Sequence, residues 1–383
     1  MSLSDPTLTA IPVDAGQGGL PATRAVVDLA AVARNLGRLR ARLAPTTRVV
    51  GVVKAGGYGH GLVAVARRLE AAGVDGLGVA VVEEAAALRG AGVTTPILVL
   101  SPGYEAAAAV VVELALEVVV SDLAELDPLE AAARRAGRPV GIHLKVDTGM
   151  GRLGLDAPHL ETALARLHHA PYLRLAGVMS HLACADEEGA FTGEQIDAFA
   201  TLRPRLAAAG FGAIPLHLAN TAGVVHFPAA HFDMVRPGLG LYGYGAVDLE
   251  PVLTLETRVV RVRHLAAGAT VGYGRTFRCG RPTRMGVVRI GYGDGLPRAL
   301  SNRGCLLVAG RRCPIIGRVN MDLTCIDLTD APAAAVGSVA VVIGRQGGER
   351  ITADEVAAQT GTIAYEVLCS IGPRVARVYG GGE

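Results

Sequence analysis

Short apolar runs alternate with amphipathic stretches through the first two thirds of the chain. The run VVGVVK at residues 49–54 is apolar at almost every position, which is typical of strands buried on both faces of a parallel sheet. Stretches such as residues 62–72, 122–136 and 194–209 show helical spacing of apolar residues instead. The pattern predicts eight strands, at residues 48–54, 76–81, 96–100, 117–121, 140–147, 173–181, 214–220 and 234–242.

Eight strands with helices between them predict an α/β fold, a (β/α)₈ barrel of the TIM type. A doubly wound open sheet is the alternative, but the even spacing favours a closed barrel. We expect an N-terminal arm at residues 1–23 and the barrel domain at residues 24–246. A helix over residues 28–43, capped by Asp28, starts that domain and can pack beside the next one.

After residue 246 the helical pattern nearly vanishes. Short runs such as RMGVVRIGYG, LTCIDL and SVAVVIG alternate with glycine and proline turns, which predicts a mainly β domain at residues 247–383. One helix, at residues 352–360, interrupts it.

Composition excludes several classes of protein. Half of the residues are hydrophobic and the net charge is +2, unlike a disordered chain. Aromatic residues make up 4% and no basic stripe accompanies them, so we expect no nucleic-acid partner. No clean span of ~20 apolar residues and no secretory signal are visible, so we expect no membrane association and a cytoplasmic protein. The six cysteines form no CxxC pair, which favours reduced thiols, and we expect no metal site.

Lysine usage is the most informative feature of the composition. Of the 37 lysine and arginine residues, only Lys54 and Lys145 are lysines. Arginine can replace lysine as a surface charge, but a guanidinium cannot supply a reactive primary amine. Both lysines are therefore candidates for chemistry.

The predicted strands place polar residues at their carboxyl ends, the edge where barrel enzymes carry their active sites. Lys54 ends the first strand, before a glycine-rich turn that lets the backbone approach a ligand closely. Partial burial there favours the neutral amine that attacks a carbonyl. Lys145 lies in an apolar strand and should point into the barrel, where it needs a partner or a modification; an ion pair with Asp147 or another carboxylate is the structural alternative.

The later strands add further candidates at the same edge. His181 ends the sixth strand, and the seventh ends in LHLANTAG. The loops after the last two strands often form a phosphate site in such barrels, with uncharged donors such as the Thr221 hydroxyl and the amides near Gly238. The candidates in these segments are Arg152, His181, His217, Asn220, Thr221, Arg236, Gly238 and Leu239.

The ordered set of motifs VVKAGGYGHG, KVDTGMGRLGL, HLANTAG, MVRPGLGLYG, VGYGRTF, IGYGDG, GRVNMD and YEVLCSIGPRVARVY resembles the alanine racemase family over residues 24–379. The resemblance implies a barrel followed by a β domain, pyridoxal 5'-phosphate (PLP) as cofactor, and a head-to-tail homodimer whose active sites are shared. Two departures stand out. Gly56 and Gly57 replace the family's usual polar residue and alanine, which predicts a looser loop behind Lys54. Pro373 replaces a tyrosine that contacts phosphate.

Site roles follow from the resemblance, position by position. Lys54 matches the lysine that holds PLP and acts as one base, and Tyr273 matches the opposite base, supplied by the other subunit. Arg236 matches the residue at the pyridine nitrogen, backed by His217. The remaining matches are Tyr58, Asn220, Thr221, Gly238 and Leu239 for cofactor binding; His181 and Arg152 near the tyrosine base and cofactor; Lys145, a position often carbamylated, for pairing with Arg152; Met321 for the substrate carboxylate; Tyr292 for the access channel; and Asp322 as support.

The implied activity is two-base interconversion of L- and D-alanine, which supplies D-alanine for peptidoglycan. A racemase of broader amino-acid range is the closest alternative. A PLP-dependent decarboxylase is less favoured, because that class places an acidic residue at the pyridine nitrogen where this chain has Arg236. A PLP carrier of the same barrel type would lack the β domain.

Overall fold

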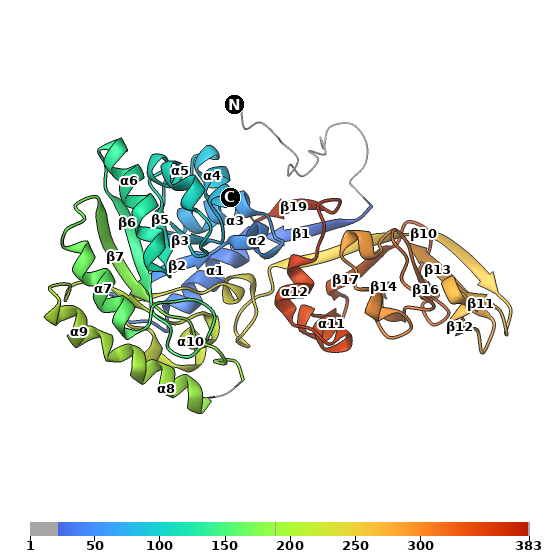
Figure 1. Cartoon of the computed structure of the whole chain (residues 1–383). Helices are drawn as coiled ribbons and strands as arrows, with labels where there is room; N and C mark the ends of the chain where they lie inside the picture. Colours follow the sequence, from blue (N-terminus) through green and yellow to red (C-terminus); the bar gives the residue numbers. More distant parts are fainter. Residues whose placement is uncertain (1–21, 188, 382–383) are drawn as a thin grey trace. The chain divides into compact units, whose positions relative to one another are not determined.

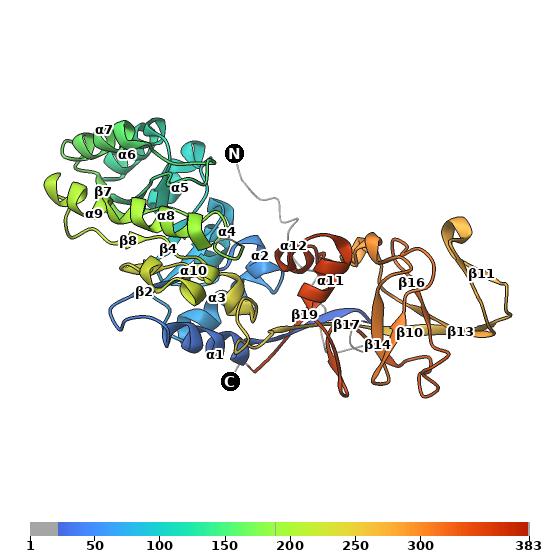
Figure 2. The same ribbon diagram turned by 90° about the horizontal axis from the view of Figure 1, so that it is seen from below.

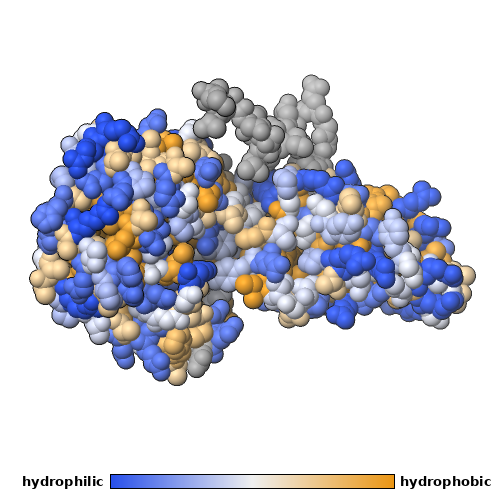
Figure 3. Space-filling model, viewed as in Figure 1, coloured by the Kyte–Doolittle hydropathy of each residue, from blue (hydrophilic) through white to orange (hydrophobic). Residues whose placement is uncertain are grey.

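The computed structural model describes residues 22–187 and 189–381, which form two compact units. The first comprises residues 30–57, 61–187 and 189–250; the second comprises residues 22–29, 58–60 and 251–381. Of the expected arm at residues 1–23, residues 1–21 lie outside the described residues. No helix of the described residues is long and apolar enough to cross a membrane. On the face shown in Figure 3, the barrel unit is mainly hydrophilic with scattered apolar residues.

The first unit is a closed barrel of parallel strands with helices around it, as the apolar pattern predicts (Figure 1). Within the described residues its eight strands are β2 (Arg48–Val52), β3 (Gly76–Val79), β4 (Ile97–Val99), β5 (Glu117–Val120), β6 (Val140–Lys145), β7 (Leu173–Met179), β8 (Leu216–His217) and β9 (Met234–Val235). The surrounding helices are α1 (Leu29–Arg40), α3 (Leu62–Ala71), α4 (Val82–Gly90), α5 (Ala108–Glu113), α6 (Leu126–Ala136), α7 (Ala157–Leu167), α8 (Gly189–Ala200), α9 (Leu202–Ala208) and α10 (Thr221–His226).

Strands β8 and β9 are much shorter than predicted. The prediction at residues 234–242 is wrong beyond Val235, because residues 239–242 form a single 3₁₀ turn, η4. Its buried apolar residues are read equally well as a strand by pattern alone. Lys54 also lies outside the strand and begins the short helical segment α2 (Lys54–Tyr58).

The barrel interior is packed by alternate strand residues. Leu98, Val119 and Met179 form one buried cluster from three different strands. His143 and Lys145 are both buried in β6 and lie two residues apart, so they share one face of the strand.

The second unit is built on a twisted sheet. Within the described residues this sheet has nine strands, with the main order β15-β14-β17-β10-β1-β19 (Figure 2). Its strands are β1 (Arg24–Asp28), β10 (Leu253–Leu265), β13 (Thr283–Val288), β14 (Cys305–Val308), β15 (Arg311–Pro314), β16 (Thr324–Asp327), β17 (Val339–Gln346), β18 (Glu349–Ile351) and β19 (Ala376–Gly380), and β11 (Thr270–Val271) pairs separately with β12 (Phe277–Arg278).

The start of the chain differs from expectation. Residues 24–28, expected to enter the barrel domain, form β1 in this second sheet, antiparallel to β10 and parallel to β19. Asp28 is the last residue of this strand and directly precedes α1, which covers Leu29–Arg40 and ends before the predicted residue 43. The alternation of buried and half-buried side chains in RAVVD is the signal for a strand.

Two helices lie together in the second unit, α11 (Ala353–Thr360) and α12 (Ala364–Cys369) (Figures 1 and 2). The first agrees with the expected helix, and Thr352 caps it by accepting a hydrogen bond from the amide of Glu355 at 3.0 Å. The second is missing from the sequence interpretation.

Candidate active site

A left-handed turn presents Lys54 at the carboxyl end of β2. The next four residues, Ala55 to Tyr58, have φ values of 54°, 63°, 66° and 52°. Side chains with a Cβ disfavour this region, whereas glycine adopts it freely. Gly56 and Gly57 therefore adopt the turn without the strain that a Cβ would add there. The amide of Gly57 also bonds to the carbonyl of Val53 at 2.8 Å, which closes the turn.

Lys145 ends β6 inside the barrel, where its side chain is 3% exposed. Its Nζ donates to the carbonyl oxygen of Leu153 at 2.8 Å. Asp147, the suggested ion-pair partner, instead accepts hydrogen bonds from the backbone of its own loop, at the amides of residues 149–151. Burial, and to a smaller extent the nearby arginines 236 and 152, lower the pKa of Lys145 to about 8 despite the opposing charge of Asp147.

Four cations influence His181, which follows β7. Burial, followed by the charges of Arg236, Arg152, Lys145 and Lys54, lowers the pKa of His181 to about 3. His181 is consequently neutral at physiological pH. The same electrostatic effect indicates that the two lysines and two arginines lie near His181, although they come from the ends of three different strands, β2, β6 and β9.

Arg236, just after β9, is 4% exposed and is buried about as deeply as Lys145. Burial lowers its pKa to about 9, so the guanidinium is still charged near neutrality. Its Nη1 donates to Nδ1 of His217 at 2.8 Å. The other close acceptors are the carbonyl oxygens of Ser180 at 2.7 Å, His217 at 2.9 Å and Leu218 at 3.1 Å.

Thr221 organises the loops after the last two strands. Its Oγ1 accepts hydrogen bonds from the amides of Gly238 at 3.1 Å and Gly240 at 3.0 Å. The amide of Gly238 thus donates to a side chain of the protein, while the hydroxyl of Thr221 retains its own hydrogen to donate. Asn220 accepts a bond from the amide of Gly223 at 2.9 Å and caps α10. Leu239 begins η4 and is buried.

The other predicted site residues belong to the second unit. Tyr273 and Met321 are strongly exposed, at 71% and 53%, and Tyr292 is 44% exposed. Tyr292 lines a cavity of about 350 Å³ in this unit. Tyr58 packs against Tyr365, with ring centroids 5.9 Å apart, and burial raises its pKa.

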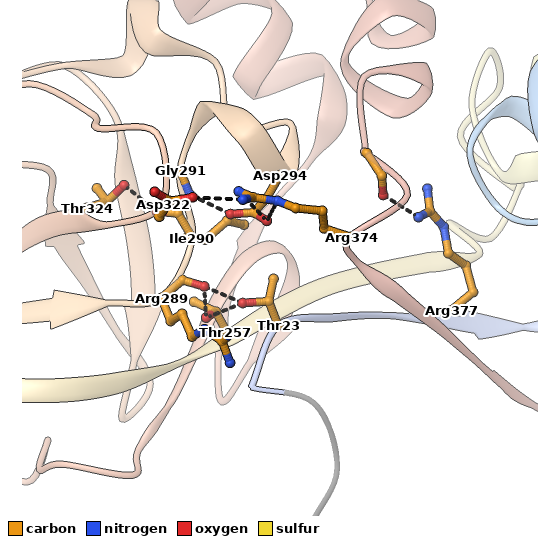
Figure 4. Close-up of polar contacts among 11 residues, drawn as sticks. Thr23, Thr257, Arg289, Ile290, Gly291, Asp294, Asp322, Thr324, Arg374 and Arg377 are labelled. Atoms are coloured by element: carbon orange, nitrogen blue, oxygen red, sulfur yellow. Dashed lines mark hydrogen bonds and ion pairs between the residues drawn. The ribbon is translucent and has the colours of Figure 1, made fainter. Parts of the chain in front are cut away.

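Arg374 links the two loops that carry Tyr292 and Met321 (Figure 4). Its Nη1 bonds to Asp322 at 2.8 Å, and its Nη2 lies 3.0 Å from Asp294. The sequence interpretation includes Asp322 but misses Arg374. Nearby, the hydroxyl of Thr257 donates to the carbonyl of Arg289 at 3.0 Å, where Thr23 donates as well.

Two further polar residues inside the barrel were missed, Glu117 and His143. The ring of His143 meets that of His217 edge to face, with centroids 4.9 Å apart, and its Nε2 lies 3.0 Å from Glu117. A signal was available, because His143 and Lys145 share one strand face. No cluster of histidine, cysteine and carboxylate side chains able to hold a metal ion occurs in the described part of the chain.

The comparisons with known proteins agree across both units. Residues 27–246 match the family "Alanine racemase, N-terminal domain", and residues 252–379 match "Alanine racemase, C-terminal domain". Curated relatives named alanine racemase include one from Sorangium cellulosum, 44% identical over 93% of this chain and 98% of its own, and one from Symbiobacterium thermophilum, 45% identical over 95% and 98%. A similar solved structure is the alanine racemase from D-cycloserine-producing Streptomyces lavendulae, with a TM-score of 0.89 and 37% identity over 95% of this chain and 98% of that one. Another, from Bacillus anthracis with bound L-Ala-P, has a TM-score of 0.89 and 34% identity over 96% and 97%.

Proposed function

The chain belongs to the alanine racemase family, and we propose that it interconverts L- and D-alanine with PLP as cofactor. The observation that carries the proposal is the buried Arg236, held by carbonyl oxygens and a neutral histidine at the site where Lys54 and Lys145 meet. We further propose that the D-alanine formed supplies peptidoglycan synthesis.

The chemistry of the donors fits an anionic cofactor. Four cations influence one neutral histidine, and the Thr221 hydroxyl has a hydrogen to donate beside the turn at Gly238. We propose that Lys54 holds PLP covalently, that Thr221, Asn220, Gly238, Leu239 and Tyr58 hold its phosphate end, and that Arg236 and His181 contact its ring. PLP supplies an electron sink that makes the α-hydrogen of a bound amino acid acidic.

The residues of this chain would then move the proton on Cα of the bound alanine. Racemisation requires a proton to leave Cα on one face and to return on the other. We propose that Nζ of Lys54 serves one face and the phenol oxygen of Tyr273 serves the other. Tyr273 is 71% exposed on its own unit, which suits a residue that completes the site of a partner subunit. Arg152 and Met321 are the proposed contacts for the substrate, with Lys145, Tyr292 and Asp322 in support.

Arg236 favours racemisation over decarboxylation. Its guanidinium stays protonated, so it can only donate hydrogen bonds and leaves the pyridine nitrogen as an acceptor. A carboxylate there would let that nitrogen hold a proton and would make a stronger electron sink. The arginine therefore limits the lifetime of a carbanion and its side reactions.

The direct test is an assay of purified protein with added PLP over a panel of L-amino acids, with chiral detection of both enantiomers. We expect D-alanine from L-alanine, with the other amino acids turned over poorly. Comparable rates for several amino acids would indicate the broader racemase. Release of carbon dioxide without D-alanine would contradict the proposal.

A mixing experiment tests the shared site. Homodimers of Lys54→Ala or of Tyr273→Phe should not racemise alanine appreciably. Subunit exchange should produce heterodimers with one doubly altered site and one intact site, and so about half the activity per dimer if the sites act independently. If both bases of a site came from one subunit, each site would keep one lesion and mixing would restore nothing.

A further inference from the structure

A line of hydrogen-bonded side chains crosses the barrel interior from Arg236 to Glu117. Nη1 of Arg236 lies 2.8 Å from Nδ1 of His217, and Nε2 of His217 lies 2.8 Å from Nδ1 of His143. Nε2 of His143 lies 3.0 Å from Oε2 of Glu117. Both histidines are almost completely buried, at 0% and 1% exposed. We call these four residues the relay.

Each bond of the relay has one possible direction. A guanidinium only donates, so Nδ1 of His217 must accept and its proton must lie on Nε2. That proton is donated to Nδ1 of His143, whose own proton must then lie on Nε2. Glu117, an acceptor only when ionised, receives the last bond. Both histidines are therefore neutral, each in the Nε2-protonated tautomer.

Glu117, the last residue of the relay, is ionised and held in place by two hydrogen-bond donors. Although burial raises the pKa of its carboxyl group, bonds from His143 and Arg174 outweigh burial and hold that pKa at about 2. Nη2 of Arg174, on β7, lies 2.8 Å from the other carboxylate oxygen. The anion is thus present at neutral pH and is fixed between two elements.

Two strand glycines make room for the relay. A Cβ added to Gly177 would lie 2.4 Å from Nδ1 of His143 and 3.1 Å from Nε2 of His217, in the space of their hydrogen bond. A Cβ added to Gly141 would lie 2.9 Å from Oε1 of Glu117. Neither glycine has a positive φ, so close approach explains both. The pairing of β6 with β7 also shifts register beside His143, which pairs with Gly177.

We propose that Glu117 and His143 are positioning residues for racemisation, which act on Arg236 through His217. The inference rests on the proposed function, in which Arg236 meets the cofactor ring. The relay fixes His217 as an acceptor, and this fixes the guanidinium in one orientation as a pure donor. It also connects a buried cation to an anion, since the acceptors that hold Arg236 directly are three carbonyls and imidazole nitrogens.

The relay holds charge in place and does not conduct protons. A proton that moved along the relay from Glu117 toward Arg236 would have to be bound by Nδ1 of His217. That nitrogen cannot bind it, because it already accepts a hydrogen bond from the charged guanidinium of Arg236. The expected consequence of breaking the relay is therefore a misplaced Arg236. Because none of the proposed substrate contacts belongs to the relay, kcat should fall while KM for alanine changes little.

The first test needs no catalysis. Nitrogen-15 NMR of histidine-labelled holoenzyme distinguishes protonated from unprotonated ring nitrogens for the ten histidines of the chain. Spectra of His143→Gln and His217→Gln assign the two signals. We expect unprotonated Nδ1 and protonated Nε2 in both residues near neutral pH. A proton on Nδ1 of His217 would overturn the relay, whether or not the protein racemises alanine.

The second test separates positioning from packing. His143→Gln keeps one acceptor and one donor in similar places, whereas His143→Leu keeps neither. We expect kcat to fall about tenfold or more in His143→Leu and Gly177→Ala, and much less in His143→Gln. Gly76→Ala is the matched control, because a Cβ there meets only the movable side chain of Val50 at 3.3 Å and the carbonyl oxygen of Pro96 at 3.6 Å.

The kinetic outcomes are decisive in both directions. Folded His143→Leu with kcat within about twofold of the parent would overturn the proposal. An equal loss in His143→Gln and His143→Leu would also contradict it, because packing alone would then explain the loss. If Gly177→Ala fails to fold, the comparison of His143→Gln with His143→Leu and the nitrogen-15 spectrum still test the proposal. An inactive parent enzyme would refute the proposed function, and the nitrogen-15 spectrum would then still test the hydrogen bonds of the relay.

Discussion

Replacing Thr221 by valine should destabilise the barrel unit by removing one oxygen atom. Thr221 is 3% exposed, and its hydroxyl accepts the amides of Gly238 at 3.1 Å and Gly240 at 3.0 Å. Valine has nearly the same shape, so both amides would face a methyl group. A buried donor left without an acceptor costs about 1–3 kcal/mol, so two such donors should cost about 2–6 kcal/mol.

Thr221→Ser is the matched control. Serine keeps the acceptor and loses one methyl group, which should cost about 1 kcal/mol. The difference between the two variants therefore isolates the hydrogen bonds. It should be positive by at least about 1 kcal/mol, even at the lower limit for the unpaired amides.

Urea unfolding of the PLP-free protein, followed by far-ultraviolet circular dichroism, gives the stability difference. Because a chain of two units can unfold in more than one transition, amide hydrogen exchange should also be measured. Protection at Gly238 and Gly240 should fall in Thr221→Val and persist in Thr221→Ser. Equal stability and equal protection in the two variants would refute the assigned hydrogen bonds.

Three further outcomes follow from the same structure. Gly56→Ala should lower the free energy of unfolding by about 1–2 kcal/mol, because φ is 63° at this position, although nothing lies within 4 Å of the new Cβ. Gly37→Ala in α1 should instead raise the free energy of unfolding by about 0.5–1 kcal/mol, and thermal unfolding of both variants compares these effects. The parent protein should be more stable than Glu117→Gln by its full margin above about pH 5, and this margin should disappear toward pH 2. The reason is that the pKa of the Glu117 carboxyl group in the folded protein, about 2, lies below its ordinary value. Urea unfolding at a series of pH values over this range measures the margin. Borohydride reduction of the holoenzyme and peptide mapping should place the pyridoxyl group on Lys54, and finding it on Lys145 would contradict the proposed cofactor lysine.

The barrel could be predicted because each of its strands carries a local signal. All eight apolar runs became barrel strands, and even the two shortest, β8 and β9, lie within their predicted ranges at residues 214–220 and 234–242. The order of the second sheet could not be predicted in this way. Pairing of β1 with β10 joins Arg24 to Glu256, a contact that no local periodicity specifies.

The candidate site shows the same division. Lys54 and Lys145 stood out because they are the only lysines of the chain, and Arg236 because it matches a family motif. His143 did not, since a lone histidine in a buried strand has many structural explanations. Its proposed positioning role depends on a neighbour on β8 and a glycine on β7, and these are set by register across the barrel. The glycines of the turn after Lys54 were visible, but their effect depended on φ values that sequence does not give.

Under the proposed function, burial explains why positions 145 and 236 carry different cations in a chain that otherwise uses arginine almost exclusively. Both side chains lie inside the barrel, and desolvation lowers both pKa values. Arginine begins so high that Arg236, at about 9, stays charged near pH 7 and remains a pure donor. Lysine begins lower, and at a pKa of about 8 Lys145 has about a tenth of its amine neutral at pH 7. Only a neutral amine can form a carbamate, the modification implied at this position by the family resemblance. An arginine at 145 would keep the positive charge but exclude that chemistry, whereas a lysine at 236 would approach neutrality where the proposed function requires a permanent donor.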